Sequence, residues 1–468
     1  MNALRPARSL AALLMLLSGA PAGVTGDAPP AHVTSFVHVT IVPMDREVLL
    51  EDQTVVIANG RIREIGQSER IKTPDKSVVI DGHGKYLMPG LADMHTHTWD
   101  ENDFTLLIAN GVTTIRNMFG DPMQLEWRRR IEAGDLVGPT IYTAGPIIDG
   151  NPPIWPGSAV VETAERAREV VAEQHKAGYD FLKVYSGLSK EAYDAVLEAA
   201  KKIRMPVVGH TPIPVGLAHV LHSGIRSIEH LTGYETALVK EQADTPDQSR
   251  WTRVDETRFA AIAGETAKAG VWNCPTFTVY QNRATPGEPE FVQKMLDRPE
   301  MRYVSPETVQ SWRPENNFIK SFSPARIVSQ RQSDPTRKKF VKALYDAGAR
   351  LLLGTDYPNP FVVPGFSIQA ELRNFVEAGL SPYEAIRAGT SGAAEFLGAG
   401  KEFGTVAAGR RADLLLLDGD PLKDVANVSR RAGVMIRGKW LPQADLTAML
   451  EKLAAAYDTK RKTVQEGG

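Results

Sequence analysis

The clearest chemical signal in this sequence is a pair of histidines at the end of a short apolar run. His95 and His97 are two residues apart, where the run LMPGLADMH ends. Residues i and i+2 of a β-strand point to the same side, so both imidazoles could reach one metal ion. The spacing alone is a weak signal, because two packed or surface histidines can show it as well.

Three further polar residues end apolar runs of the same kind. His210 ends VVGH, His230 ends SIEH and Asp356 ends LLGTD. Imidazole and carboxylate groups together are typical ligands of zinc and related transition metals. The single cysteine, Cys274, cannot build a thiolate zinc site, so a metal here would depend on nitrogen and oxygen ligands. These side chains form one site if the ends of their strands meet.

The elements that must position these residues alternate as in a parallel α/β fold. Short apolar runs read as strands, and helical runs such as TAERAREVVAEQHKAG and KEAYDAVLEAAKKI lie between them. Eight such repeats predict a (β/α)8 TIM-like barrel over residues 86–399, in which all strands end at one mouth. The eight strand candidates are LMPGLADMH, GVTTIRNM, PTIYTAG, YDFLKVY, MPVVGHT, IRSIEHL, GVWNCPTF and ARLLLGTDY.

One long insertion interrupts the predicted barrel. Residues 278–340 separate the seventh strand from the eighth and contain several prolines. An insertion of this length in a compact domain is usually functional. A lid over the site and a peripheral helical decoration are both compatible with it.

Segments rich in β-structure flank the barrel on both sides. Residues 32–85 contain short strands with turn signals, and Asn59-Gly60 between two apolar runs predicts a hairpin. Residues 400–445 return to the same type of pattern. We expect the two flanks to close into one small β-sandwich domain built from both ends of the chain.

The composition is that of a soluble globular protein. The chain has 468 residues, of which 43% are hydrophobic and 24% charged. Its net charge of -2 comes from 54 basic and 56 acidic residues, so no basic excess favours binding to nucleic acid. The composition leaves open whether the protein is a homo-oligomer.

The first residues predict export from the cytoplasm. Residues 1–22 resemble a signal peptide, since Arg5 and Arg8 precede a short apolar run and residues 20–22 offer a small-residue cleavage site. No later segment approaches the length of a membrane span, so we expect no stable membrane anchor. The mature protein is expected to be periplasmic or secreted.

As a set, these motifs resemble the amidohydrolase superfamily. More narrowly, they resemble its branch of imidazolonepropionase-related proteins and zinc-dependent Xaa-Pro dipeptidases. The resemblance covers nearly all of the chain beyond the predicted signal peptide, and it is specific for the superfamily but much less so for a substrate. The segments that carry it are GLADMHTHTW, FLKVYSG, VVGHT, SIEHLTG, LLLGTDYP and GTVAAGRRADLLLLDGDP.

The resemblance implies a site for two divalent metal ions, with zinc expected. His95 and His97 would bind the buried ion, and His210 and His230 the more exposed one. Lys183 would be an N6-carboxylysine that bridges the two. The chemistry agrees with a bridge, because two close cations repel each other unless an anion lies between them.

The resemblance also assigns roles to three other side chains. Asp356 would be a metal ligand and the general base. Tyr185 follows two residues after Lys183 and would help to polarise the scissile carbonyl, although a packing tyrosine is the alternative. Many relatives carry Arg-Asp after the second strand, where this chain has Arg116-Asn117. Arg116 would either contact a substrate carboxylate or have a structural role.

Together these inferences predict a metal-dependent hydrolase of an amide-type C–N bond. A hydroxide bridging the two metals would attack a dipeptide or an N-acyl amino acid, with an aspartate as the base. One alternative is hydrolysis of a cyclic amide, an ester or an aryl-amide of xenobiotic type. Another is a non-catalytic metal-binding protein on the same fold, but all six expected metal positions contain competent residues, which argues against it.

Overall fold

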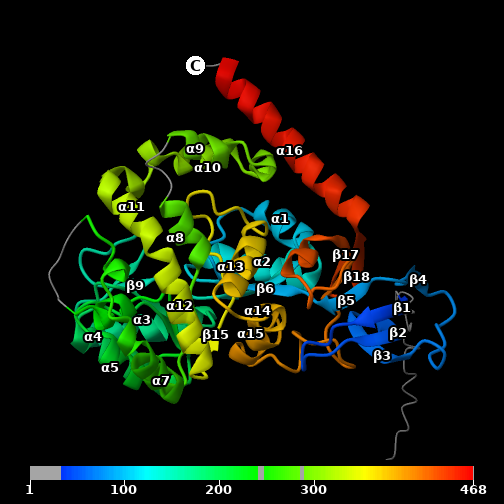
Figure 1. Ribbon diagram of the computed structural model, residues 1–468, viewed down its shortest axis with the longest axis horizontal. Helices are drawn as coiled ribbons and strands as arrows, with labels where there is room; N and C mark the ends of the chain where they lie inside the picture. The colour runs from blue at the N-terminus through cyan, green and yellow to red at the C-terminus, as the bar shows by residue number, and fades with distance from the viewer. Residues whose placement is uncertain (1–32, 241–246, 285–288, 467–468) are drawn as a thin grey trace, which may run out of the picture.

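Eight parallel strands form the barrel, as the sequence predicts (Figure 1). The computed structural model describes residues 33–240, 247–284 and 289–466, so the predicted signal peptide lies outside the described residues. Parallel bridges between Ala144 and Phe181 and between Thr96 and Tyr357 join the two sheets of the barrel and close the ring. The strands are β6 (Leu91–Thr96), β7 (Val112–Asn117), β8 (Thr140–Thr143), β11 (Leu182–Val184), β12 (Val207–Gly209), β13 (Ser227–Glu229), β14 (Trp272–Cys274) and β15 (Arg350–Leu351).

Helices surround this ring, and their ends follow local sequence signals. In α3, the Thr163 side chain accepts a hydrogen bond from the Arg166 backbone N–H, and Gly178 ends the helix with a φ of 91°. In α4, the Ser189 side chain caps the first turn. The surrounding helices are α1 (Asp103–Ala109), α2 (Pro122–Ala133), α3 (Ala164–Ala177), α4 (Lys190–Ile203), α5 (Leu217–His222), α6 (Tyr234–Leu238), α7 (Phe259–Ala269), α12 (Asp334–Asp346), α13 (Ser367–Glu377), α14 (Pro382–Ala388) and α15 (Ser391–Phe396).

The insertion between β14 and β15 is helical. It packs against the long C-terminal helix α16 (Gln443–Glu466) through an apolar cluster that includes Met301, Trp312, Leu453 and Tyr457. Figure 1 shows α9 and α10 on the same side of the barrel as α16. Apart from α12, the helices of the insertion are α8 (Phe277–Arg283), α9 (Pro289–Leu296), α10 (Pro306–Trp312) and α11 (Pro324–Gln332).

Strands from both ends of the chain form a second, separate unit. Its order is β18-β17-β16-β5-β1-β2-β3, with β4 paired to β1, and the antiparallel β5–β16 pair joins the two ends. Asn59 and Gly60 have φ values of 52° and 75°, as the predicted hairpin requires. The strands are β1 (Thr34–Ile41), β2 (Leu50–Ala58), β3 (Arg61–Gln67), β4 (Val78–Asp81), β5 (Tyr86–Pro89), β16 (Leu414–Leu417), β17 (Arg431–Ile436) and β18 (Lys439–Pro442).

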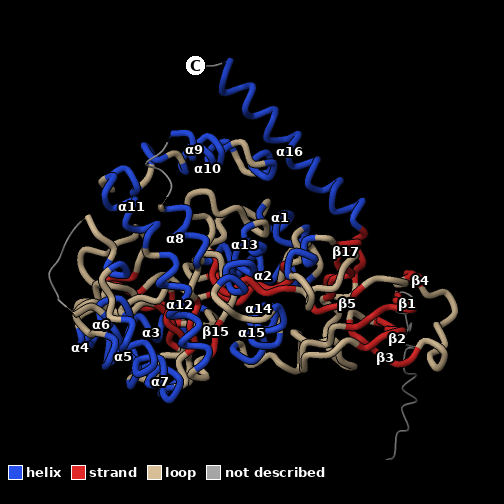
Figure 2. Tube along the Cα trace, viewed as in Figure 1, coloured by secondary structure: helices blue, strands red, loops and turns tan. Residues whose placement is uncertain are grey.

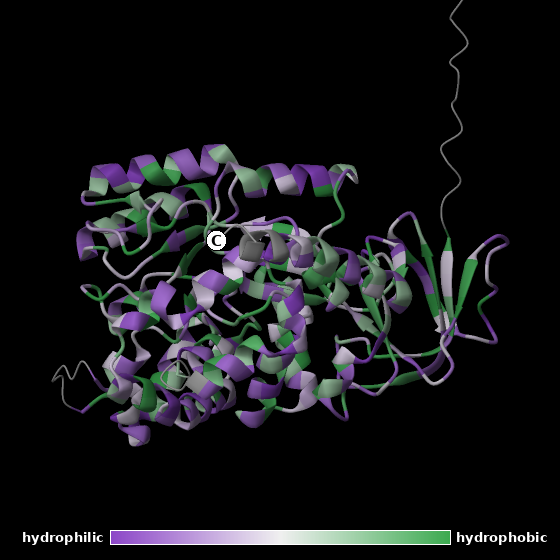
Figure 3. Ribbon diagram, turned by 90° about the horizontal axis from the view of Figure 1, so that it is seen from above, coloured by the Kyte–Doolittle hydropathy of each residue, from purple (hydrophilic) through white to green (hydrophobic). Residues whose placement is uncertain are grey.

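The distribution of strands and hydropathy explains why the two units are stable. Figure 2 shows the strands gathered in the interior of the barrel and in the flanking unit, with helices outside the barrel. Figure 3 shows hydrophobic residues along the strands of the flanking unit, at the right of the view. Their core includes Phe36, Ile57, Leu87 and Leu414. Within the described ranges, no helix combines the length and the apolar character needed to cross a membrane.

Candidate active site

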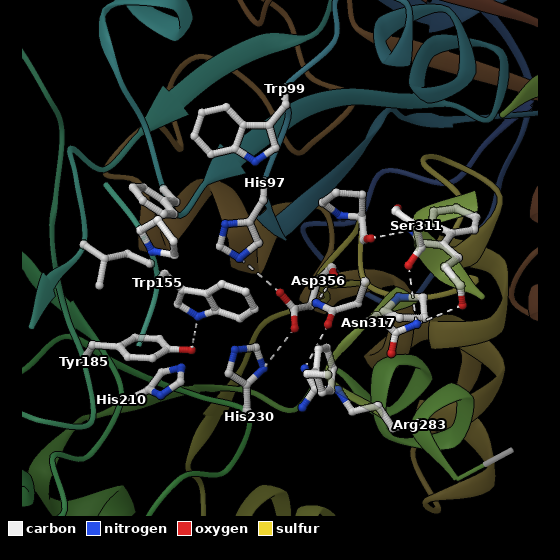
Figure 4. A pocket seen from close by; sticks show the side chains of 18 of the residues that line it. His97, Trp99, Trp155, Tyr185, His210, His230, Arg283, Ser311, Asn317 and Asp356 are labelled. Carbon is white, nitrogen blue, oxygen red and sulfur yellow. Dashed lines mark hydrogen bonds and ion pairs between the residues drawn. The ribbon is translucent and has the colours of Figure 1, made fainter. Parts of the chain in front are cut away.

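The structure brings the six predicted metal-binding residues together at the carboxyl end of the barrel. Figure 4 shows four of them, His97, His210, His230 and Asp356, around the cavity. Asp356 lies at the centre of the group. One of its carboxylate oxygens is 3.1 Å from His97 Nε2 and 3.5 Å from His95 Nε2, and the other is 3.8 Å from His230 Nδ1. The rings of His210 and His230 are 5.1 Å apart, centroid to centroid.

The backbone turns sharply where these side chains enter the site. His230, Thr276 and Asp356 have φ values of 61°, 51° and 62°, in the left-handed region that residues other than glycine rarely adopt. Strain of this kind is commonly found at functional sites. At Gly354, an added Cβ would lie 2.8 Å from the His95 backbone nitrogen, so glycine permits the close approach of these two segments.

In both His95 and His210, one ring nitrogen has an outer partner and the other ring nitrogen has no hydrogen bond within the described residues. The Nδ1 of His95 contacts Glu229 Oε2 at 2.8 Å, and the Nδ1 of His210 contacts Ser186 Oγ at 3.0 Å. The Nε2 atoms of both rings are buried and have no hydrogen-bond partner among the described residues. Outer partners that occupy one ring nitrogen and orient the other are typical of metal-binding histidines.

The geometry and the protonation states of this cluster fit a divalent cation. Ligand atoms of His95, His230 and Asp356 all lie within 4.8 Å of one another. Burial lowers the pKa of His95, His210 and His230 well below the ordinary value, with a smaller contribution from the charge of Lys183. The imidazoles are therefore neutral near pH 7, which is the form that binds metals.

Lys183 lies in β11 on the floor of the cavity. Its side chain is almost fully buried, and burial lowers its pKa to about 8, although the negative charges of Glu229 and Asp356 act in the opposite direction. Most of the amine is therefore still protonated at pH 7, but the neutral fraction is much larger than that of an exposed lysine. The neutral amine is the form that can react with carbon dioxide.

Arg116 does not reach the cavity, in contrast to the substrate contact considered for it. Its side chain is fully buried, and Nη2 donates to both oxygens of Glu229 at 3.0 and 2.9 Å. Its Nη1 donates to Ser227 Oγ at 3.0 Å. Glu229 in turn contacts His95, so Arg116 lies behind the metal-binding residues and orients one of them through a carboxylate.

Asn117, which replaces the aspartate of many relatives, connects the ends of three strands. Its Oδ1 accepts a hydrogen bond from the Thr98 backbone N–H, and its Nδ2 donates to Thr143 Oγ1 at 3.1 Å and to the Phe119 carbonyl oxygen at 2.8 Å. An amide can donate and accept at once, whereas an ionised carboxylate only accepts. The asparagine therefore suits this position, and Arg116 forms its ion pair with Glu229.

A cavity of about 490 Å³ opens above the predicted metal-binding residues. Its volume is in the range typical of small-ligand sites. Trp99, Phe119 and Trp155 form an apolar wall, and the insertion contributes Trp312 and Phe318. The insertion therefore forms part of the cavity wall, and a lid function for residues 278–340 stays a prediction.

Tyr185 lines this cavity beside His210. The two rings are 3.9 Å apart, centroid to centroid, and the Tyr185 hydroxyl accepts a hydrogen bond of 2.8 Å from Trp155 Nε1. Burial raises the pKa of Tyr185 to about 12. The phenol therefore remains protonated, and its hydrogen is available to a ligand in the cavity.

Helix α8 contributes two side chains that sequence reasoning missed. Tyr280 and Arg283 line the cavity, and the Tyr280 hydroxyl donates to the His230 carbonyl oxygen at 3.1 Å. The buried carboxylate of Glu371 fixes the start of α8, because it accepts from the backbone N–H groups of Phe277 and Thr278 at 2.8 and 2.9 Å. The sequence around Tyr280 and Arg283 has no spacing pattern that predicts a site. Glu229 could have been noticed as a candidate, because it is an acidic residue within the strand run SIEH.

Comparison with known proteins decides the family. Residues 86–441 match the amidohydrolase family. The chain belongs to this family. It is therefore an amidohydrolase-type hydrolase, in a family whose members generally bind divalent metals and include homologues that act on C–N bonds.

Several curated relatives are similar over most of this amidohydrolase. It is 22% identical to ochratoxinase of Aspergillus niger over 468 residues, which cover 86% of this chain and 84% of that protein. It is 25% identical to imidazolonepropionase of Deinococcus radiodurans over 394 residues, covering 81% and 88%. It is 24% identical to an adenine deaminase of Moorella thermoacetica over 399 residues, covering 80% of this chain but only 52% of that protein.

Solved structures confirm the fold of barrel and β-unit. Bottromycin amidohydrolase superposes with a TM-score of 0.75 at 27% identity, covering 92% of this chain and 91% of that one. A putative prolidase from Bifidobacterium longum superposes with a TM-score of 0.67 at 24% identity, covering 90% and 99%. The predicted resemblance to Xaa-Pro dipeptidases and imidazolonepropionases is thereby confirmed.

Proposed function

We propose that this amidohydrolase cleaves the amide C–N bond of a dipeptide or an N-acyl amino acid. The observation that carries the proposal is the convergence of three histidines, one lysine and one aspartate on the floor of a single cavity, with the buried His95 next to the aspartate. The names of similar proteins agree with it, since they include ochratoxinase, a putative prolidase and a Xaa-Pro dipeptidase crystallised with methionine in its active site.

The cofactor in this proposal is a pair of divalent cations, with zinc as the first candidate. His95 and His97 would hold one ion, His210 and His230 the other, and Asp356 would contribute a carboxylate oxygen. When bound, such ions activate water and polarise a carbonyl group. Lys183 would link them as a carbamate, in which its nitrogen bonds to the carbon of carbon dioxide and a proton is released.

The remaining steps are assigned to two side chains of the cavity. The Asp356 carboxylate accepts a proton from the attacking water and delivers it to the nitrogen of the leaving amine as the C–N bond breaks. The Tyr185 hydroxyl donates a hydrogen bond to the carbonyl oxygen while that oxygen gains negative charge. Trp155 orients the phenol for this contact through its own hydrogen bond to Tyr185.

The experiment that tests this function measures amine release by the purified mature protein. The protein is reconstituted with zinc and bicarbonate, then assayed across dipeptides and N-acyl amino acids with a chelator control. Metal-dependent hydrolysis of a related subset supports the proposal. If no compound of the library is hydrolysed although elemental analysis verifies bound metal, the proposal is wrong.

A second candidate, an aryl-amide or ester of xenobiotic type, is favoured by the apolar wall of the cavity. Trp99, Phe119 and Trp155 suit a flat aromatic group better than a small polar one. Aryl-amide and aryl-ester substrates in the same assay separate this candidate from the first.

The export of the protein is a further part of the proposal. Cleavage after residue 22 would release the mature chain to the periplasm or the medium. N-terminal sequencing of the protein from its native fractions tests this, because an intact N-terminus in a cytoplasmic fraction contradicts export.

A further inference from the structure

Among the residues that the structure describes, Arg283 in the cavity wall has no carboxylate partner. Its Nη2 donates to Asn359 Oδ1 at 2.9 Å, and its Nε is buried without a hydrogen-bond partner among the described residues. No ion pair of Arg283 occurs within the described part of the chain. A guanidinium with unused donors beside an apolar cavity favours binding of an anion, because a carboxylate would satisfy both its charge and its hydrogen-bonding groups.

The position of this guanidinium is fixed by its surroundings. It lies over the ring of Phe318 at 4.9 Å and over that of Tyr280 at 5.7 Å, measured to the ring centroids. Asn359, which binds it, also donates from Nδ2 to the backbone oxygen of Asp356 at 2.8 Å. Arg283 is therefore tied to the same turn that presents the aspartate, so its location relative to the reaction centre is well defined.

The cavity has two chemically different sides. Figure 4 shows Arg283 and Asn317 on one side of Asp356, and Trp155 and Tyr185 on the other. The Asn317 amide is already engaged within its own loop, where Nδ2 donates to the Trp312 carbonyl oxygen at 3.0 Å and Oδ1 accepts from the Ile319 N–H. Lys183, the other cationic residue of the lining, lies within the metal-binding cluster. Arg283 is therefore the residue best placed to bind an anion away from that cluster.

We propose that Arg283 binds the free α-carboxylate of the amino acid that the enzyme releases, while the acyl group lies against Trp99, Phe119 and Trp155. This inference rests on the proposed amide hydrolysis, and it adds the orientation of the substrate. With the scissile carbonyl above the metal-binding residues, the carboxylate extends toward α8 and the acyl group toward the aromatic wall. The substrate class is an N-acyl amino acid with a flat, apolar acyl group.

The test compares two ligands that differ only in this charge. N-benzoylglycine carries a carboxylate, and N-benzoylglycinamide replaces it with a neutral amide. Calorimetry measures the binding of each to the zinc-loaded protein, and turnover is followed separately. Wild-type protein is expected to bind the carboxylate about 10- to 100-fold more tightly, as for a lost charge-assisted hydrogen bond.

Variants assign this preference to one residue. Arg283→Gln should lose the preference for the carboxylate and raise KM much more than it lowers kcat, whereas Arg283→Lys should restore part of it. Arg326→Gln is the matched control, because Arg326 belongs to the same insertion, stacks over Phe322 and does not line the cavity. Thermal melting of each variant verifies that the fold is retained.

The outcomes separate this inference from the proposed function. Equal affinity of the wild type for both ligands, or an unchanged preference in Arg283→Gln, overturns the role of Arg283 even where amide hydrolysis occurs. A preference that disappears in Arg283→Gln without any turnover supports the carboxylate site and rejects the hydrolysis of this substrate class. Equal losses in Arg283→Gln and Arg326→Gln also overturn the inference, because they indicate a general effect of charge.

Discussion

The floor and the rim of the cavity are built in different ways. On the floor, Lys183 on β11 and Asp356 beyond β15 line the cavity, His95 on β6 lies next to Asp356, and all three are almost fully buried. On the rim, Trp99 and Trp155 are 41% and 39% exposed and come from the loops that follow strands. The floor is thus fixed by the barrel, whereas the rim can vary without disturbing it, which is how one barrel supports many substrates.

The contacts behind the two regions differ in the same way. His95 on the floor is connected through Glu229 to Arg116, across residues far apart in the sequence. Asn317 on the rim is bonded mainly to neighbours within its own loop. Substitutions on the floor should therefore affect metal binding and stability, and those on the rim mainly substrate affinity.

The largest effect is expected from Lys183→Ala on the floor. The variant should lose bound metal and activity together, because no anion then links the two cations. Elemental analysis and the amide assay measure both losses, and a short-chain carboxylic acid should partly restore them. Full metal occupancy in Lys183→Ala would rule out the carbamate bridge.

Asp356→Asn should lower kcat by about 10²- to 10⁴-fold, the usual contribution of a positioned acid–base group. The amide is close in shape to the carboxylate but cannot take up the proton. Steady-state kinetics and thermal melting, compared with the wild type, measure the loss and the retained fold. Activity at the wild-type level would remove Asp356 as the base.

Glu229→Gln should weaken metal binding by about 10- to 100-fold, as expected when the group that orients a metal-binding histidine is lost. It should also lower the free energy of unfolding by about 3–5 kcal/mol, because Arg116 then remains buried without its anion. Metal titration and denaturant unfolding measure these changes.

Glu126→Gln is the matched control for Glu229→Gln, since Glu126 pairs with Arg129 on the surface. Solvent screens an exposed pair of this kind, so Glu126→Gln should change stability far less than Glu229→Gln. If both variants change stability equally, the contrast between the buried floor and the exterior is wrong.

The smallest effect is expected on the rim, from Trp155→Phe. The change keeps an aromatic ring but removes the Nε1 donor that contacts the Tyr185 hydroxyl. The loss of one neutral hydrogen bond is expected to lower kcat by about 3- to 10-fold, with metal content unchanged. Trp99→Phe is the control, and a loss of metal in Trp155→Phe would contradict the independence of the two regions.

The sequence by itself determined the features that depend on local pattern. The periodicity of the strand and helix runs predicted the barrel, and α4 begins and ends where the run KEAYDAVLEAAKKI does. The strand-end positions of His95, His210, His230 and Asp356 placed them at one mouth, because parallel strands of a barrel all end on the same side. The resemblance to the amidohydrolases added Lys183, which position alone does not distinguish.

Only the tertiary structure decided what surrounds these residues. The sequence left Arg116 either a substrate contact or a structural role, and the structure pairs it with Glu229, which is 113 residues away in the sequence. No sequence pattern marked Arg283 as a residue of the cavity. It lies there because Glu371 binds the first residue of α8, Phe277, from which it is separated by 94 residues. Such pairings depend on how strands and helices pack, and local sequence patterns do not encode the distance between side chains brought together by the fold.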